Sequence, residues 1–64
     1  MLRNNIFNLV NQLSQESKSL WRIKNEYMQE AIGNDDMMSF WKKLEADKEA
    51  HITELEAIIK KSLK

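Results

Sequence analysis

The chain has 64 residues, with ten basic and ten acidic side chains, one glycine, no proline and no cysteine. A chain this short forms at most one domain, and small folds of this size usually need a disulfide, a metal or self-association. The absence of cysteine excludes disulfides and thiolate-bound zinc or iron–sulfur clusters. The balanced charge gives no overall field for nucleic acid, and no apolar stretch approaches the roughly 20 residues of a membrane span. We therefore expect neither nucleic acid nor membrane as a partner, and a cytoplasmic location.

The first half of the chain predicts one helix over about residues 2–32. Its apolar residues recur at alternating spacings of four and three, the pattern of a heptad seam, and the one charged residue in that seam is Glu16. Beside the seam, further apolar residues widen the stripe beyond what one neighbouring helix covers. The seam consists of Leu2, Ile6, Leu9, Leu13, Glu16, Leu20, Ile23 and Tyr27, and the widening residues include Phe7, Val10 and Trp21.

The predicted turn lies at residues 33–34. Glycine is the usual left-handed residue just past a helix end, and Gly33 is the only glycine of the chain. Asn34, Asp35 or Asp36 can cap the following helix, and the two carboxylates favour its positive end. The chain is therefore expected to fold back on itself at Gly33.

The second half predicts a helix over about residues 35–63, again with spacings of four and three. Two polar residues, Lys48 and His51, interrupt its seam. The seam consists of Met37, Trp41, Leu44, Lys48, His51, Leu55, Ile58 and Ser62, and Phe40, Ile52 and Ile59 broaden it.

These patterns predict an all-α fold, one antiparallel two-helix hairpin over residues 1–64. A hairpin covers only one side of each helix, so part of the broad apolar surface should remain exposed in a monomer. Two hairpins that pair into a four-helix bundle would cover it. The expected partner is thus a second copy of the chain, and the expected interface residues are Phe7, Val10, Trp21, Phe40, Ile52 and Ile59.

The three polar interruptions of the two seams are expected to meet. Glu16 lies seventeen residues before Gly33, while Lys48 and His51 lie fifteen and eighteen residues after it. Residues at equal distance from the turn of an antiparallel hairpin lie at the same level. The sequence therefore predicts one polar layer made of Glu16, Lys48 and His51.

The polar residues of this layer resemble a motif of the ferritin-like proteins, the rubrerythrins and their relatives. The resemblance rests on Glu16 in the first helix and on residues 40–51, Phe-Trp-Lys-Lys-Leu-Glu-Ala-Asp-Lys-Glu-Ala-His, in the second. In each two-helix half of that family, a glutamate from the first helix and a Glu-x-x-His pair from the second hold a di-iron centre. Encapsulated ferritins also belong to it, and there such halves dimerise.

One position departs from the family pattern. Glu16 matches the first-helix ligand and His51 matches the histidine, but Lys48 stands where the bridging glutamate belongs. A protonated lysine cannot bind a metal ion, and it replaces a negative charge with a positive one. We therefore expect no di-iron centre of the family type and no cofactor.

Three functions follow as hypotheses. In the leading one, Lys48 and His51 satisfy Glu16 without metal, and the chain is a non-enzymatic, self-assembling ferritin-like module. In the second, the chain is a metal-binding or iron-oxidising protein, in which His51 and Glu16 bind iron or manganese together with Asp47 or Glu54, which share the helix face of His51. In the third, the chain is a coiled-coil adaptor for the helix of another protein. No serine has a histidine placed to activate it, so hydrolase chemistry is not expected.

Overall fold

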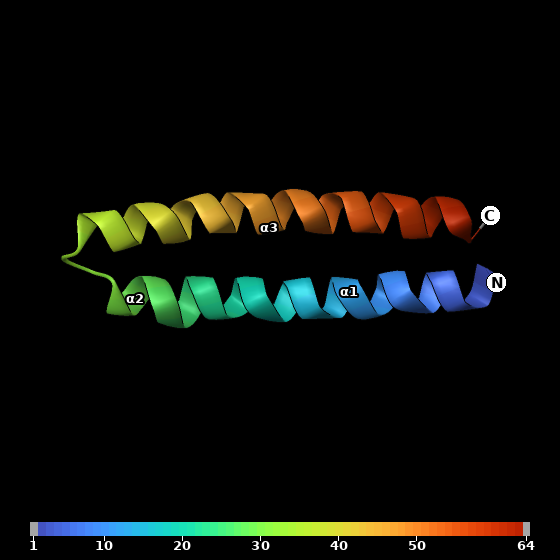
Figure 1. The fold of residues 1–64 in the computed structure, drawn as a ribbon, viewed down its shortest axis with the longest axis horizontal. Coiled ribbons are helices and arrows are strands. Elements are labelled where there is room, and N and C mark those ends of the chain that lie inside the picture. Colours follow the sequence, from blue (N-terminus) through green and yellow to red (C-terminus); the bar gives the residue numbers. More distant parts are fainter. Residues whose placement is uncertain (1, 64) are drawn as a thin grey trace.

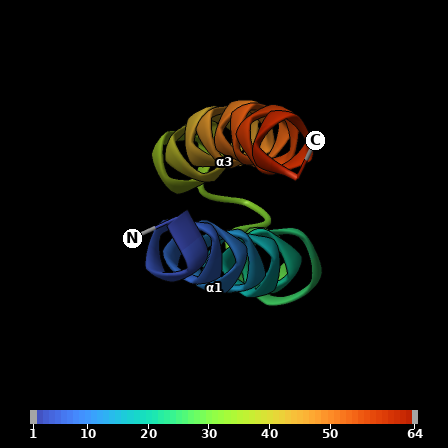
Figure 2. The same ribbon diagram turned by 90° about the vertical axis from the view of Figure 1, so that its right-hand side faces the viewer.

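The computed structural model describes residues 2–63, with side chains from Asn4 onward, and this part of the chain contains helices and one turn but no strand. The first arm consists of α1 (Leu2–Arg22), a π-helical segment η1 (Ile23–Tyr27) and α2 (Met28–Glu30), and the second arm is α3 (Asp35–Ser62). The arms run antiparallel, with both chain ends at one end of the hairpin (Figure 1). The end-on view shows only these two arms (Figure 2). The predicted all-α class is confirmed.

The hairpin is a thin rod, with extents of 47 × 14 × 14 Å. Among the residues whose side chains are described, only Ile23, Ala31 and Glu16 are buried. No described helix is both long and apolar enough to cross a membrane. Two arms alone leave most side chains in contact with water.

The turn between the arms is built from the residues predicted for it. Gly33 has φ +94°, a left-handed conformation that a side chain would strain. The Asn34 side chain caps α3, because its Oδ1 accepts a hydrogen bond of 3.0 Å from the backbone N–H of Met37. Asp35 and Asp36 occupy the first turn of α3, where carboxylates favour the positive end of the helix.

The first arm ends at Glu30 rather than near residue 32, and it is not a uniform α-helix. In η1 the backbone N–H of Met28 donates to the carbonyl of Ile23, five residues back instead of four. The residues that face α3 there, Ile23, Tyr27 and Ala31, follow one another at two successive spacings of four. A turn with one extra residue keeps all three on the same side of the arm. The π-helical segment thus carries the inward face of the arm down to the turn.

The seam of the first arm agrees with the prediction from Ile6 to Tyr27, while the side chain of Leu2 lies outside the described residues. All the seam residues in this range are buried or half-buried. The Tyr27 ring, six residues before Gly33, contacts the Trp41 ring of α3, eight residues after it, with centroids 4.9 Å apart.

In α3 four of the eight predicted seam residues, Trp41, Leu44, Lys48 and Leu55, are half-buried, but at three others the half-buried residue is the next one along the chain. Met37 and Ile58 were expected to face the first arm, but they are 57% and 42% exposed. Their neighbours Met38 and Ile59 are half-buried instead. The half-buried residues of α3 are Met38, Trp41, Leu44, Glu45, Lys48, Ile52, Leu55 and Ile59.

Replacing Asn34 with alanine should destabilise the hairpin by about 1 kcal/mol, because the backbone N–H of Met37 loses its acceptor. Urea unfolding followed by circular dichroism, at fixed protein concentration, measures the change. Asn34→Asp keeps an acceptor at this position and serves as the control, with little expected loss. Equal losses in both variants would contradict a capping role for Asn34.

Candidate functional site: a polar layer at the middle of the hairpin

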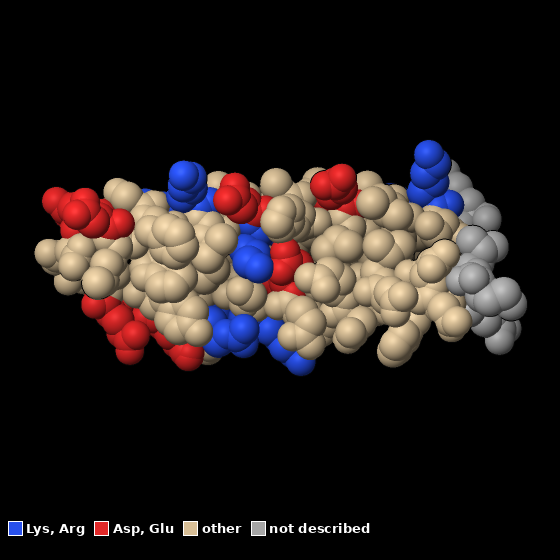
Figure 3. Space-filling view, in the orientation of Figure 1, with Lys and Arg blue, Asp and Glu red and all other residues tan. Residues whose placement is uncertain are grey.

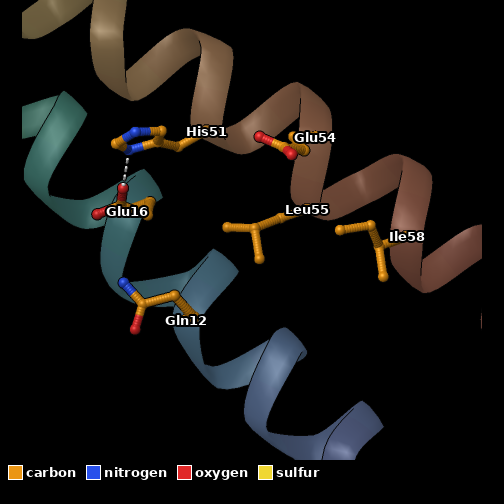
Figure 4. A pocket seen from close by; sticks show the side chains of 6 residues that line it. All are labelled: Gln12, Glu16, His51, Glu54, Leu55 and Ile58. Carbon is orange, nitrogen blue, oxygen red and sulfur yellow. Dashed lines mark hydrogen bonds and ion pairs between the residues drawn. The ribbon is translucent and has the colours of Figure 1, made fainter.

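Glu16 of α1 binds two side chains of α3 at once. Its Oε2 accepts a hydrogen bond of 2.8 Å from Lys48 Nζ, and its Oε1 lies 2.8 Å from His51 Nδ1. Figure 4 shows the second of these contacts, with the imidazole directed toward the carboxylate across the gap between the arms. The three residues predicted to form one layer do so.

The three members of the layer differ in their exposure to water. The Glu16 side chain is 9% exposed, that of Lys48 is 21% exposed and that of His51 is 57% exposed. No buried side-chain nitrogen or oxygen of the described residues lacks a hydrogen-bond partner. A buried carboxylate is costly when unpaired, so the two donors from α3 are what allows Glu16 to occupy a seam position.

The surroundings of Glu16 keep it ionised. The hydrogen bond from Lys48 lowers the pKa of the Glu16 carboxyl most, and burial raises it by a smaller effect. The hydrogen bond from His51 and the charges of both neighbours lower the pKa further, so that it lies below its usual value. An ionised carboxylate only accepts hydrogen bonds, and Nδ1 of His51 is therefore the nitrogen that carries the proton toward Glu16.

An open pocket of about 310 Å³ lies beside the layer (Figure 4). Glu54, one turn beyond His51, lies at its rim, while two apolar side chains of α3 and one amide of α1 complete the wall. Its lining residues are Gln12, Glu16, His51, Glu54, Leu55 and Ile58. The pocket places the exposed imidazole on one face of the hairpin.

The residues of the layer do not fit the di-iron centre of the ferritin-like proteins. Both oxygens of Glu16 already have partners in the hairpin, and Lys48 brings a positive charge to the position of the bridging ligand. Among the described residues, no three histidine, aspartate or glutamate side chains lie close enough to share a metal ion. Of the two further carboxylates predicted as alternative ligands, Glu54 lines the pocket and Asp47 is exposed on the helix surface.

A second group of charges, which the sequence analysis did not predict, joins the arms nearer the turn. Lys24 Nζ lies 3.3 Å from Glu49 Oε2 and 3.8 Å from Glu45 Oε2. Residues two apart on a helix point to different sides, so Glu49 and His51 lie on opposite sides of the α3 seam. These ion pairs are partly exposed, and each contributes at most about 1 kcal/mol. The ion pairs of Lys24 therefore lie on the face of the hairpin opposite the pocket.

Comparisons with protein-family models, with curated proteins and with solved structures returned no match for this chain. The ferritin-like resemblance therefore rests on residues of this sequence alone, chiefly Glu16 and His51.

Glu16→Gln should remove a contribution to stability that depends on pH. The folded pKa lies below the unfolded value of about 4.5, so the contribution is fully present above that value and is lost as the pH falls through the folded pKa. Near neutral pH, wild type should exceed Glu16→Gln by about 1–3 kcal/mol in free energy of unfolding. The groups that face Glu16 are Lys48 and His51.

Urea unfolding of both proteins between pH 7 and pH 3 provides the measurement. The difference between them should shrink once the pH drops below about 4.5. A difference that stays constant over this range would contradict an ionised, paired Glu16.

Proposed function

We propose that this chain is a non-enzymatic structural module that pairs with a second copy of itself into a four-helix bundle. In this proposal, the Glu16–Lys48–His51 layer occupies the place that a metal site holds in ferritin-like proteins. The observation that supports it best is the exposure of large apolar side chains. Phe40 is 56% exposed and Ile58 42% in the hairpin alone, and on another part of its surface Phe7 is 67% exposed and Trp21 59%. A soluble monomer rarely leaves so much of its apolar surface in contact with water.

The exposed apolar residues lie on two faces. Phe40, His51 and Ile58 repeat at helical spacings on one side of α3, and the pocket places His51 and Ile58 beside Gln12 of α1. We call this side of the hairpin the pocket face. Its apolar members of α3, Phe40 and Ile58, are both exposed.

The second group of exposed apolar residues belongs to α1. Val10 and Trp21 share a helix side with Lys24, because their spacings of eleven and three residues are close to whole turns. Lys24 pairs with Glu49 on the far side of the α3 seam from His51. Val10 and Trp21 therefore lie on the face opposite the pocket, and Phe7 shares their side of α1 because it lies fourteen residues, close to four turns, before Trp21.

The six residues expected at a single interface are thus distributed over three places. Phe40 lies on the pocket face, the three α1 residues lie on the opposite face, and Ile52 and Ile59 are half-buried between the arms. One pairing of hairpins covers one face only. The other face stays available for assembly beyond a dimer.

The size of the hairpin supports pairing through a face. A face of 47 × 14 Å amounts to about 660 Å² per copy, or about 1,300 Å² for two copies, within the range of about 1,200–2,000 Å² that stable protein interfaces bury. Charged side chains avoid much of the surface in Figure 3, where they gather mainly along the two long edges and in one mixed pair near the middle. Apart from that one pair, the surface of the described residues between the two edges in Figure 3 lacks charge, as the buried core of an interface does.

Phe40→Glu should convert the dimer into a monomer, because it places a charge in the apolar part of the pocket face. Sedimentation equilibrium at micromolar concentration measures the mass. Ala50→Glu adds the same charge to an exposed position near the middle of α3 and serves as the control, which should remain dimeric. A wild-type protein that is monomeric and folded at this concentration would contradict the proposal and favour a partner helix from another protein.

One contact favours a second candidate, the binding of a metal ion such as iron or manganese. A histidine that binds a metal usually donates its other ring N–H to a carboxylate, and His51 Nδ1 is bound to Glu16 in this way. The other ring nitrogen, Nε2, stays free of Glu16, and Glu54 lines the same pocket. This pair is too few ligands for a tight site, which makes metal binding the weaker candidate.

Metal analysis separates the two candidates. Protein purified after growth with added iron and manganese should contain much less than one metal ion per chain, and a chelator should leave its mass in solution unchanged, since residues 2–63 bring no three histidine, aspartate or glutamate side chains together. Stoichiometric metal in wild type that disappears in His51→Ala would establish the second candidate instead. Gln15→Ala, an exposed change one residue from Glu16, is the matched control.

A further inference from the structure

We infer that the two copies pair through their pocket faces about a two-fold axis parallel to the long axis of the hairpin, so that α1 of each copy lies over α3 of the other. This inference rests on the proposed self-association and adds the arrangement of the two chains. A two-fold axis between two facing surfaces must lie in the plane of contact. For a rod it runs either along the helices or across them.

The polar layer lies at the middle of both arms, so either axis brings the layers of the two copies together. The first arm runs from Leu2 to Glu30, with Glu16 at its centre, and α3 runs from Asp35 to Ser62, with Lys48 at its centre. The charges of the layer therefore decide between the two axes.

An axis across the helices would place α1 over α1 and α3 over α3. The two Glu16 carboxylates would then face each other at the centre of the bundle, and the two Lys48 side chains would do the same. Glu16 is ionised and almost entirely shielded from water in each hairpin. Like charges that meet within an interface oppose association strongly, unless a cation lies between the carboxylates.

An axis along the helices reverses this relation. Each Glu16 then faces α3 of the second copy at the level of its Lys48 and His51, so that opposite charges meet across the interface. The exposed imidazole of His51, whose Nδ1 contacts Glu16 of its own hairpin, gains the second copy as a neighbour. The layer becomes a closed network of four donors and two carboxylates without a metal ion.

The edges of the pocket face favour the same axis. Arg22 and Glu26 continue the helix side of Gln12, and Lys43 and Asp47 share the helix side of His51 and Glu54. The contacts of Glu16 with Lys48 and of Tyr27 with Trp41 show which residues of the two arms lie at the same height along the hairpin. With the axis along the helices, Arg22 comes level with the second copy's Asp47, and Glu26 with its Lys43. With the axis across them, Asp47 instead comes within about one turn of the second copy's Glu54.

Distance measurement between single labels tests the arrangement. The chain has no cysteine, so Ser62→Cys gives one spin label per copy, near the end of α3. With the axis along the helices both labels lie at the same end of the bundle. Their separation should then be below about 30 Å, since diagonal helices of a bundle lie only about 14 Å apart. With the axis across the helices the labels lie at opposite ends of a 47 Å rod.

Double electron–electron resonance on the dimer reads this distance, and Ala50→Cys, near the middle of α3, is the control because both arrangements give it a short distance. A short distance for both labels supports the inference. A distance of about 40 Å or more for Ser62→Cys, with a short one for Ala50→Cys, overturns the inference but leaves self-association intact. The absence of a dipolar signal from both, with a monomeric mass, overturns the proposed function itself.

Discussion

The Glu16 carboxylate fixes the position of one arm of the hairpin against the other. It accepts from two side chains of α3 that lie one turn apart, Lys48 and His51, and uses one oxygen for each. If α3 slid by one turn, about 5.4 Å, one of these donors would move into the place of the other, and only one oxygen of the shielded carboxylate would keep a partner. An apolar residue at position 16 would pack in several registers, whereas the carboxylate accepts only one. Buried polar groups often serve helix pairs in this way, setting register more than adding stability.

The turn fixes the same register from the other end. Gly33 in its left-handed conformation and the Asn34 cap determine where α3 begins, and the Tyr27–Trp41 contact is the next level of packing. The π-helical segment lies between these two points of constraint. It takes up one extra residue, so that Ile23 and Ala31 both remain buried between the turn and the polar layer. The π-helical segment thus makes the register set by the turn compatible with the register set by the polar layer.

The features that the sequence predicts well are those with a local chemical cause. Gly33 and Asn34 mark the turn by their own conformational preferences, and the Glu16–Lys48–His51 layer follows once the turn is placed. The inward residues of α3 were harder to predict where adjacent residues are both apolar, as in the pairs Met37–Met38 and Ile58–Ile59. Either member of such a pair satisfies the heptad pattern, and packing against the first arm selects the second. The π-helical segment depends on that packing too, although the two successive spacings of four from Ile23 to Ala31 were a visible signal.

The sequence predicts the three residues of the candidate site, but it does not predict the ion pairs and apolar faces around them. The ion pairs of Lys24 with Glu45 and Glu49 need the arms to be placed in space before they can be found, and so does the division of the apolar residues between two faces. That division matters for function, because it assigns the polar layer and Phe40 to the same surface. In the proposed dimer, Lys48 at the position of a bridging glutamate would let two copies of this surface meet through complementary charges. Two carboxylates that face each other would instead need a metal ion.

Native mass spectrometry tests the central claim, a metal-free bundle of two hairpins, most directly, because one spectrum gives both the number of chains and any bound metal. For a chain of 7.6 kDa the proposed function predicts a species of twice the chain mass with no additional mass from iron or manganese. A spectrum containing only folded single chains, or a dimer that carries stoichiometric metal, would contradict it.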